Sequence, residues 1–182
     1  MSAPVLEADT LRLVPFGPAH LSARYLAWLG DRETMRFSEQ RHRIHDQHSA
    51  GEFMARMERD GHFWAIEAKD AELGHVGNIA AYLDRPNSCA DLSILVGEPA
   101  ARGRGLGRRA WCLALDWLVS PAGGMRLVTA GTMAANVAML GLMRTSGMRE
   151  YGRLQGRFLL DGKPTDLVLA ARQARLQSKD CG

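Results

Sequence analysis

Three glycines and two arginines alternate through residues 102–107, R-G-R-G-L-G, and two more arginines follow at 108 and 109. Because glycine has no Cβ, its backbone N–H group can approach a phosphate closely. A helix that begins here adds roughly half a positive charge at its N-terminus, and the arginines neutralise the rest of the phosphate charge. The run predicts a phosphate-binding turn, and an ordinary tight turn with incidental arginines is the alternative.

The charge of the whole chain is concentrated in the same run. The formal net charge is +3, so without Arg102, Arg104, Arg108 and Arg109 the rest of the chain carries about −1. A general nucleic-acid binder spreads positive charge over a face or along a helix. The distribution therefore favours one discrete phosphate site and no nucleic-acid partner.

Two common phosphate-binding motifs do not fit this turn. The P-loop pattern G-x-x-x-x-G-K-[ST] is absent. Residues 105–110 match the loose dinucleotide pattern G-x-G-x-x-G/A, but that motif needs an early βαβ unit and an acidic residue about 20 positions on. Residues 126–131 contain no Asp or Glu. The sequence excludes both readings.

What remains is R-x-x-G-x-G, formed by Arg102, Gly105 and Gly107, and here the chain resembles the GNAT superfamily of N-acetyltransferases. That family binds the pyrophosphate of acetyl-CoA on this turn. A second match is Asn136, followed by Gly147-Met148, which is similar to the family's asparagine helix and its terminal G-F. The resemblance covers residues 8–172 and implies acetyl-CoA as the co-substrate, in one acetyltransferase domain over residues 1–182.

The resemblance also implies the residues that hold acetyl-CoA. In the family a strand amide polarises the thioester carbonyl, and the asparagine contacts the pantetheine arm; the former maps near Leu95 and Val96. An N-cap before Val137 is a second, compatible role for the asparagine. The expected cofactor-binding residues are Leu95, Val96, Arg102, Gly103, Arg104, Gly105, Leu106, Gly107, Arg108, Asn136 and Met139.

Asp91 is the expected catalytic base, because many relatives carry a glutamate at this strand position that deprotonates the amine through water. A solvent-facing strand acid is the alternative reading, and Glu67 is the alternative base. Seven residues after Asn136, where many members have a proton-donating tyrosine, this chain has Met143. The leaving thiolate is then protonated by water or another group, or it leaves as the anion, because a thiol pKa is about 8.5.

Several segments resemble the branch that contains ribosomal-protein-alanine and nucleotide-sugar amine acetyltransferases: residues 25–29, 37–42, 77–79 and 91–97. Residues 25–48 look closest to the sugar-modifying members. We therefore expect a small-molecule acceptor, a nucleotide-linked amino sugar, with Arg41 and His42 lining its site. The alternatives are an N-terminal alanine of a ribosomal or other protein, and a non-catalytic acyl-CoA-binding module.

The histidines at 42, 45 and 48 do not indicate a metal site, because no cysteine or carboxylate cluster completes a tetrahedral set. The odd, scattered cysteines Cys89, Cys112 and Cys181 indicate reduced thiols. Glu7 and Asp9 stand where a signal peptide would carry lysines, and no apolar run suggests a membrane span. These features predict a cytoplasmic location and no membrane partner; an oligomer stays open.

The elements that position these residues follow from hydrophobic periodicity. The 182 residues, 46% hydrophobic and 24% charged, are typical of one globular domain. Strands are predicted at 10–16, 63–68, 76–83, 90–96, 126–130, 149–160 and 165–171, and helices at 18–29, 50–59, 105–119 and 137–145, with a loop at 37–49. The expected fold is α+β: a mixed, largely antiparallel sheet of about seven strands with about four helices.

Overall fold

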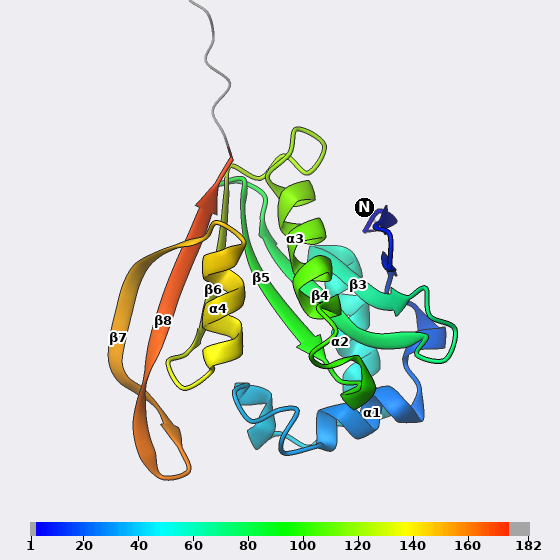
Figure 1. Cartoon of the computed structure of the whole chain (residues 1–182), viewed down its shortest axis with the longest axis horizontal. Helices are drawn as coiled ribbons and strands as arrows, with labels where there is room; N and C mark the ends of the chain where they lie inside the picture. Colours follow the sequence, from blue (N-terminus) through cyan, green and yellow to red (C-terminus); the bar gives the residue numbers. More distant parts are fainter. Residues whose placement is uncertain (1–2, 175–182) are drawn as a thin grey trace, which may run out of the picture.

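The computed structural model describes residues 3–174 and has the predicted α+β architecture (Figure 1). One sheet of eight strands has the order β1-β2-β3-β4-β5-β6-β8-β7, and every neighbouring pair is antiparallel except β5 and β6. The strand that the sequence did not predict is the two-residue β1. The strands are β1 (Leu6–Glu7), β2 (Leu11–Pro15), β3 (Gly61–Ala68), β4 (His75–Asp84), β5 (Cys89–Val96), β6 (Leu127–Met133), β7 (Arg149–Leu160) and β8 (Lys163–Gln173).

Helices cover both faces of the sheet. The helices are α1 (Ala23–Gly30), α2 (Gln47–Asp60), α3 (Leu106–Leu118) and α4 (Val137–Thr145). In Figure 1, α3 and α4 lie in front of the sheet and α2 lies behind it. Alternate side chains of β5 accordingly enter two cores: Leu92 and Ile94 pack with α3 and α4, whereas Leu95 packs with α1 and α2. Each side chain of β5 thus has a fixed face.

The predicted first residues of two helices, 18–29 and 50–59, were wrong by a few residues, because side-chain caps determine where α1 and α2 begin. The segment 18–29 is a 3₁₀ turn, Pro18–His20, followed by α1, where Ser22 Oγ accepts a hydrogen bond from Tyr25 N–H over 3.2 Å. The predicted loop 37–49 contains a second 3₁₀ turn, Glu39–His42, and the first residues of α2. Asp46 caps α2 by accepting from Ser49 N–H over 2.8 Å. Local capping thus brings more order to this segment than its polar composition indicates.

The strands β5 and β6 separate at the centre of the sheet. They pair only between Cys89–Asp91 and Leu127–Thr129, whereas β5 stays paired with β4 as far as Val96. Figure 1 shows the two strands together at one end and apart at the other. The unpaired part of β5 therefore presents free backbone groups to a gap, and α3 begins at Leu106, after a connection that contains the 3₁₀ turn Pro99–Ala101.

Candidate active site

The glycine-arginine turn ends in a helix N-terminus without a side-chain cap. Gly103 and Gly105 have φ of 73° and 75°, in the left-handed region that favours glycine. Gly105 is the N-cap of α3 and offers no side chain to its first amides; a Cβ on it would meet no atom within 4 Å. The first amides of α3 are thus available to an anion, and the space in front of the turn is open.

Gly107 lies where α3 approaches β5. A Cβ at this position would stand 3.0 Å from Val96 Cγ2, so any larger residue would push α3 away from the strand. Leu106, in contrast, is 6% exposed and belongs to the core shared by α3 and the sheet. The Leu106 side chain therefore anchors the turn to the core, and only the Leu106 backbone is available to a ligand.

The four arginines of the turn have different surroundings. Arg102 donates to Thr34 Oγ1 over 2.8 Å, and Arg109 donates to Thr10 Oγ1 over 2.9 Å. Arg104 forms an ion pair with Asp70 over 3.1 Å and lines a separate, smaller pocket of about 300 Å³. Arg108 is exposed and makes no ion pair within residues 3–174. Arg102 and Arg108 both line the large cavity beside this turn, and neither pairs with a carboxylate between residues 3 and 174.

One large cavity joins this turn to the gap between β5 and β6. Its volume is about 1460 Å³, and a single small ligand usually occupies a pocket of about 300–1,000 Å³. The cavity therefore has room for two substrates at once. Ten of the predicted site residues line it: Asp91, Leu95, Val96, Arg102, Gly103, Gly105, Gly107, Arg108, Asn136 and Met139.

The backbone of β5 presents alternate peptide groups to the gap. Gly97 N–H donates to Val76 O on the β4 side over 3.0 Å, and Ser88 O accepts from Arg126 N–H on the β6 side over 2.8 Å. The alternation of strand hydrogen bonds then turns the peptide groups of Ile94 and Val96 toward the gap and the Leu95 N–H toward β4. Of the two residues predicted to polarise a carbonyl, Val96 faces the gap.

Asn136 is both an N-cap and a cavity residue. Its Oδ1 accepts from Met139 N–H over 3.2 Å, and its Nδ2 donates to Thr132 Oγ1 over 3.1 Å. Met139 lines the cavity as predicted, but Met143 is 2% exposed and lies in the core against α3. The position where many relatives carry a tyrosine is therefore turned away from the cavity in this chain.

Asp91 lies where β5 and β6 part. It faces Thr129 at the last paired position, and Thr129 Oγ1 donates to Asp91 Oδ2 over 2.8 Å. The Asp91 side chain is exposed on its cavity side, but the surrounding protein displaces enough water to raise its pKa, and the hydrogen bond from Thr129 partly opposes this rise. Tyr82 is its cross-strand neighbour on β4, on the same face of the sheet. A carboxylate with a raised pKa at the vertex of the gap suits a general base.

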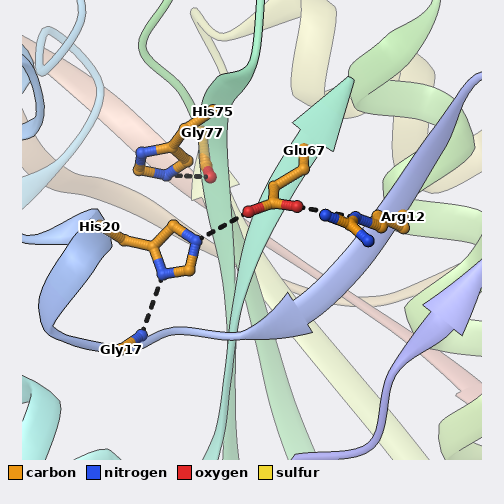
Figure 2. A network of polar contacts seen from close by, with 6 residues as sticks. All are labelled: Arg12, Gly17, His20, Glu67, His75 and Gly77. Carbon is orange, nitrogen blue, oxygen red and sulfur yellow. Dashed lines mark hydrogen bonds and ion pairs between the residues drawn. The ribbon is translucent and has the colours of Figure 1, made fainter. Parts of the chain in front are cut away.

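The alternative base, Glu67, has other partners. It accepts from Arg12 Nε over 2.7 Å and lies 3.0 Å from His20 Nε2, and Gly17 N–H donates to the other ring nitrogen of His20 (Figure 2). Burial tends to raise the pKa of Glu67, but the hydrogen bonds from His20 and Arg12 lower it below its ordinary value. Glu67 does not line the cavity. It ties β2 to β3, and the structure favours Asp91 over it.

Arg41 and His42 do not line the cavity, contrary to expectation. Arg41 donates to Leu159 O on β7 over 3.0 Å and to Ser38 O over 3.1 Å, and it pairs with Glu39. Its guanidinium is used to fasten the 3₁₀ turn to β7. His42 is exposed to solvent.

Residues near Arg41 and His42 in the structure line the acceptor side of the cavity, although the sequence did not predict them there. They come from the segment after α1, from α2 and from β4: Glu33, Phe37, Arg43, His45, Phe53, Arg56, Arg59, Asn78 and Tyr82. A signal was present for α2, since its positions 49, 52, 53, 56 and 59 recur at helical spacing and form one face. That face is the one that looks into the cavity.

Neither a metal centre nor a spanning helix is found in the part of the chain that the structure describes. Residues 3–174 contain no group of three or more His, Cys, Asp and Glu side chains placed to hold a metal ion. No helix among them is long and apolar enough to cross a membrane.

A mixed sheet with helices on both faces parts in the middle, and an uncapped helix with glycines and arginines begins beside the gap. This arrangement has the groups that suit an extended, phosphate-bearing ligand. A comparison of the chain with known protein families identifies which class of protein this is. A family model described as an acetyltransferase (GNAT) domain matches residues 10–149. The chain belongs to the GNAT family of acetyltransferases.

Individual relatives agree with this family. YwnH of Bacillus subtilis (strain 168), named for phosphinothricin acetyltransferase, is 32% identical over 105 residues, which are 53% of this chain and 63% of that protein. The chain thus spans less than two thirds of this relative. A ribosomal-protein-alanine N-acetyltransferase of Brucella melitensis has a TM-score of 0.73 and 24% identity over 90% of this chain and 98% of that one.

A spermidine N-acetyltransferase of Vibrio cholerae, solved with CoA and spermine, has a TM-score of 0.79 and 16% identity over 92% of this chain and 97% of that one. Identities of this size show that the fold is shared. They leave the acceptor open, because the three names refer to three different amines.

Proposed function

We propose that this protein is an acetyl-CoA-dependent N-acetyltransferase in which the acceptor amine attacks the thioester directly. The observation that carries the proposal is one continuous cavity with the uncapped N-terminus of α3 at one end and Asp91 at the vertex of the β5–β6 gap. The first amides of α3 and Arg108 suit the pyrophosphate, and the gap suits the pantetheine arm. Acetyl-CoA and amine can then occupy the cavity together.

The chemistry needs a neutral amine, support for the oxyanion and an exit for the thiolate. Asp91 takes a proton from the amine, directly or through water, because burial raises its pKa. The Val96 amide faces the gap, and a preorganised backbone donor of this kind lowers the barrier by roughly 3 kcal/mol. Met143 cannot donate a proton and is buried, so the thiolate leaves as the anion or takes a proton from water.

A nucleotide-linked amino sugar is the acceptor that we propose. The cavity is larger than a pantetheine arm needs, and three arginines line its acceptor side, Arg43, Arg56 and Arg59. None of the three forms an ion pair within residues 3–174, and Arg56 stands 5.2 Å from the centre of the Phe53 ring. Unpaired guanidinium groups beside an aromatic ring suit a ligand that carries phosphates and a base.

An N-terminal alanine peptide is the second candidate. The favouring observation is the shared fold over 90% of this chain with the ribosomal-protein-alanine N-acetyltransferase of Brucella melitensis. Spermidine fits less well, because the acidic cavity residues other than Asp91, namely Glu33, Glu39 and Glu52, are exposed to solvent and Glu39 is already paired with Arg41.

The experiment is thiol release from acetyl-CoA with three acceptors: a nucleotide-linked amino sugar, an alanine-initiated peptide and spermidine. We expect the highest kcat/KM with the sugar. Turnover only with the peptide would replace the sugar by the second candidate. Tight acetyl-CoA binding without turnover on any amine would instead indicate a non-catalytic acyl-CoA-binding module.

A further inference from the structure

Two polar side chains that the proposed chemistry does not use lie in the floor of the cavity. Tyr25, on α1, is 4% exposed, and Asn78, on β4, is 8% exposed. Both are cavity-lining residues. Side chains buried to this degree nearly always have their polar atoms hydrogen-bonded.

Neither side chain is satisfied by the protein. Asn78 Oδ1 is buried and has no hydrogen-bond partner. The Tyr25 hydroxyl makes no hydrogen bond with another residue between 3 and 174, and it is accessible from the cavity. Burial, with a smaller effect of the nearby Tyr82, raises the pKa of Tyr25 far above its ordinary value, so the phenol stays neutral and can donate. An unpaired buried group destabilises a fold, and a ligand in the cavity can supply the missing partner for the Asn78 carboxamide and the Tyr25 phenol.

These two side chains lie on the same face of the sheet as Asp91. Asn78, Ala80 and Tyr82 alternate along β4 opposite Leu95, Ser93 and Asp91 on β5. At roughly 3.3 Å per residue, Asn78 is about 13 Å along the strand from the Tyr82–Asp91 pair. The side chains between them, Ala80 and Ser93, are small. The floor can therefore hold a ring of sugar size with Asp91 at one end and Asn78 at the other.

The chemistry of the pair restricts what can satisfy it. A phenol donates to an oxygen, and a carboxamide both accepts and donates. A hydroxyl group, which is also both donor and acceptor, can form a hydrogen bond with either side chain. A second ammonium group would need a carboxylate beside the pair. Asp91 lies at the other end of the floor, and the remaining acidic cavity residues, Glu33, Glu39 and Glu52, are exposed.

We propose that Tyr25 and Asn78 bind hydroxyl groups of the acceptor at the end of the cavity floor opposite Asp91, and so determine which amines are accepted. The proposal rests on the proposed function, because it assigns the polar anchor of that same acceptor site. It makes the acceptor a hydroxylated amine and gives Tyr25 and Asn78 a role in specificity, with no part in proton transfer.

The test measures binding, so that it does not depend on turnover. Thermal shift with CoA present compares two matched pairs of probes: glucosamine with cyclohexylamine, and alaninamide with isopropylamine. Each pair keeps the amine and removes the hydroxyls or the carboxamide. We expect glucosamine to stabilise the wild-type protein and cyclohexylamine to have no effect at equal concentration.

Two variants then test the residues. Tyr25→Phe and Asn78→Leu should each weaken glucosamine binding about tenfold with CoA binding unchanged. Asn78→Leu should also raise the melting temperature, because it removes an unpaired buried amide. His62→Phe is the matched control: His62 Nδ1 is also buried without a partner, but His62 does not line the cavity. It should leave glucosamine binding unchanged.

The outcomes separate this proposal from the proposed function. Equal binding of glucosamine and cyclohexylamine, a preference for alaninamide alone, or wild-type glucosamine binding by both variants would overturn the hydroxyl anchor. If glucosamine binds as expected and both variants lose it, but no amine consumes acetyl-CoA, the anchor stands and the proposed activity fails.

Discussion

Thr129 Oγ1 donates a hydrogen bond to Asp91 Oδ2 over 2.8 Å at the last position where β5 and β6 are paired. One step further along the two strands, the sheet is open. Thr129 on β6 thus orients the Asp91 carboxylate at the position beyond which the β5 backbone has no partner on β6. Burial raises the pKa of the carboxylate, and Thr129 limits the rise.

Asp91→Asn should lower kcat about 10²-fold, because a positioned proton acceptor contributes that much or more. Acetyl-CoA binding should be unchanged, since the residue lies at the far end of the cavity from the turn. Steady-state kinetics and calorimetry measure the two effects. Wild-type kcat in the Asn variant would move the base to another residue.

Thr129→Val is the matched variant, because it keeps the carboxylate and removes the hydrogen bond that lowers its pKa. The ascending limb of the kcat/KM profile should therefore move to higher pH in this variant. The wild-type profile should lack a descending limb near pH 10, since Met143 replaces the family's tyrosine and burial raises the pKa of Tyr82. An unshifted limb in Thr129→Val would show that Asp91 is not the titrating base.

Gly105→Asp should abolish acetyl-CoA binding with the fold retained. The carboxylate would stand in front of the free amides of α3, where it repels a pyrophosphate. Gly105→Asn is the control, because asparagine has the same shape and meets the same φ of 75° without the charge. Calorimetry should therefore show a much smaller loss for Asn than for Asp. Equal losses in two folded variants would make backbone strain the cause.

Arg108→Ala should weaken acetyl-CoA binding about tenfold, the usual loss for one charge-assisted hydrogen bond. Arg104→Ala should weaken it less, because Arg104 already pairs with Asp70 beside the smaller pocket. The two variants remove the same charge from the same turn, so long-range electrostatics is matched. A larger loss for Arg104→Ala would place the phosphates on the outer side of α3.

The open turn before α3 and the order of elements were predictable because glycine and hydrophobic periodicity are local signals. The environment of Met143 was not, because on α4 the helical spacing alone does not show which methionine meets the cavity and which meets α3; Met139 lines the cavity and Met143 is buried. The prediction that Arg41 lines the acceptor site was wrong for a similar reason. Its partner, Leu159 O, lies 118 residues further along the chain.

Arg41→Ala should raise the acceptor KM and leave the acetyl-CoA KM nearly unchanged. The effect is indirect, because Arg41 does not line the cavity. Removing its bonds to Leu159 O and Ser38 O frees the 3₁₀ turn Glu39–His42 from β7, and neighbouring residues Phe37, Gln40 and Arg43 line the cavity. His42→Ala, in the same turn but without such bonds, should behave as wild type. A lower melting temperature for Arg41→Ala alone would support the fastening role, and equal KM values would contradict it.

Stability should fall as the pH drops below about 6.5, in part because of His75. Its Nε2 lies 2.9 Å from Gly77 O (Figure 2), and burial, with the charge of His20, lowers its pKa from 6.5 to about 4. The unfolded chain therefore binds a proton more readily than the folded one between about pH 4 and 6.5, so acid favours unfolding in this window. His62, with a pKa lowered to about 4, acts in the same direction.

His75→Phe should reduce, without abolishing, the drop in melting temperature between pH 7 and pH 5. The phenyl ring can remain among Phe16, Tyr25 and Trp28, whose rings lie near His75, and it carries no proton to gain. His62, whose pKa is also lowered to about 4, contributes to the remaining drop. The exposed His48, 83% accessible at its side chain, is the control, and His48→Phe should keep the wild-type pH dependence. A drop of wild-type size in His75→Phe would mean that His75 titrates alike in the folded and unfolded chains.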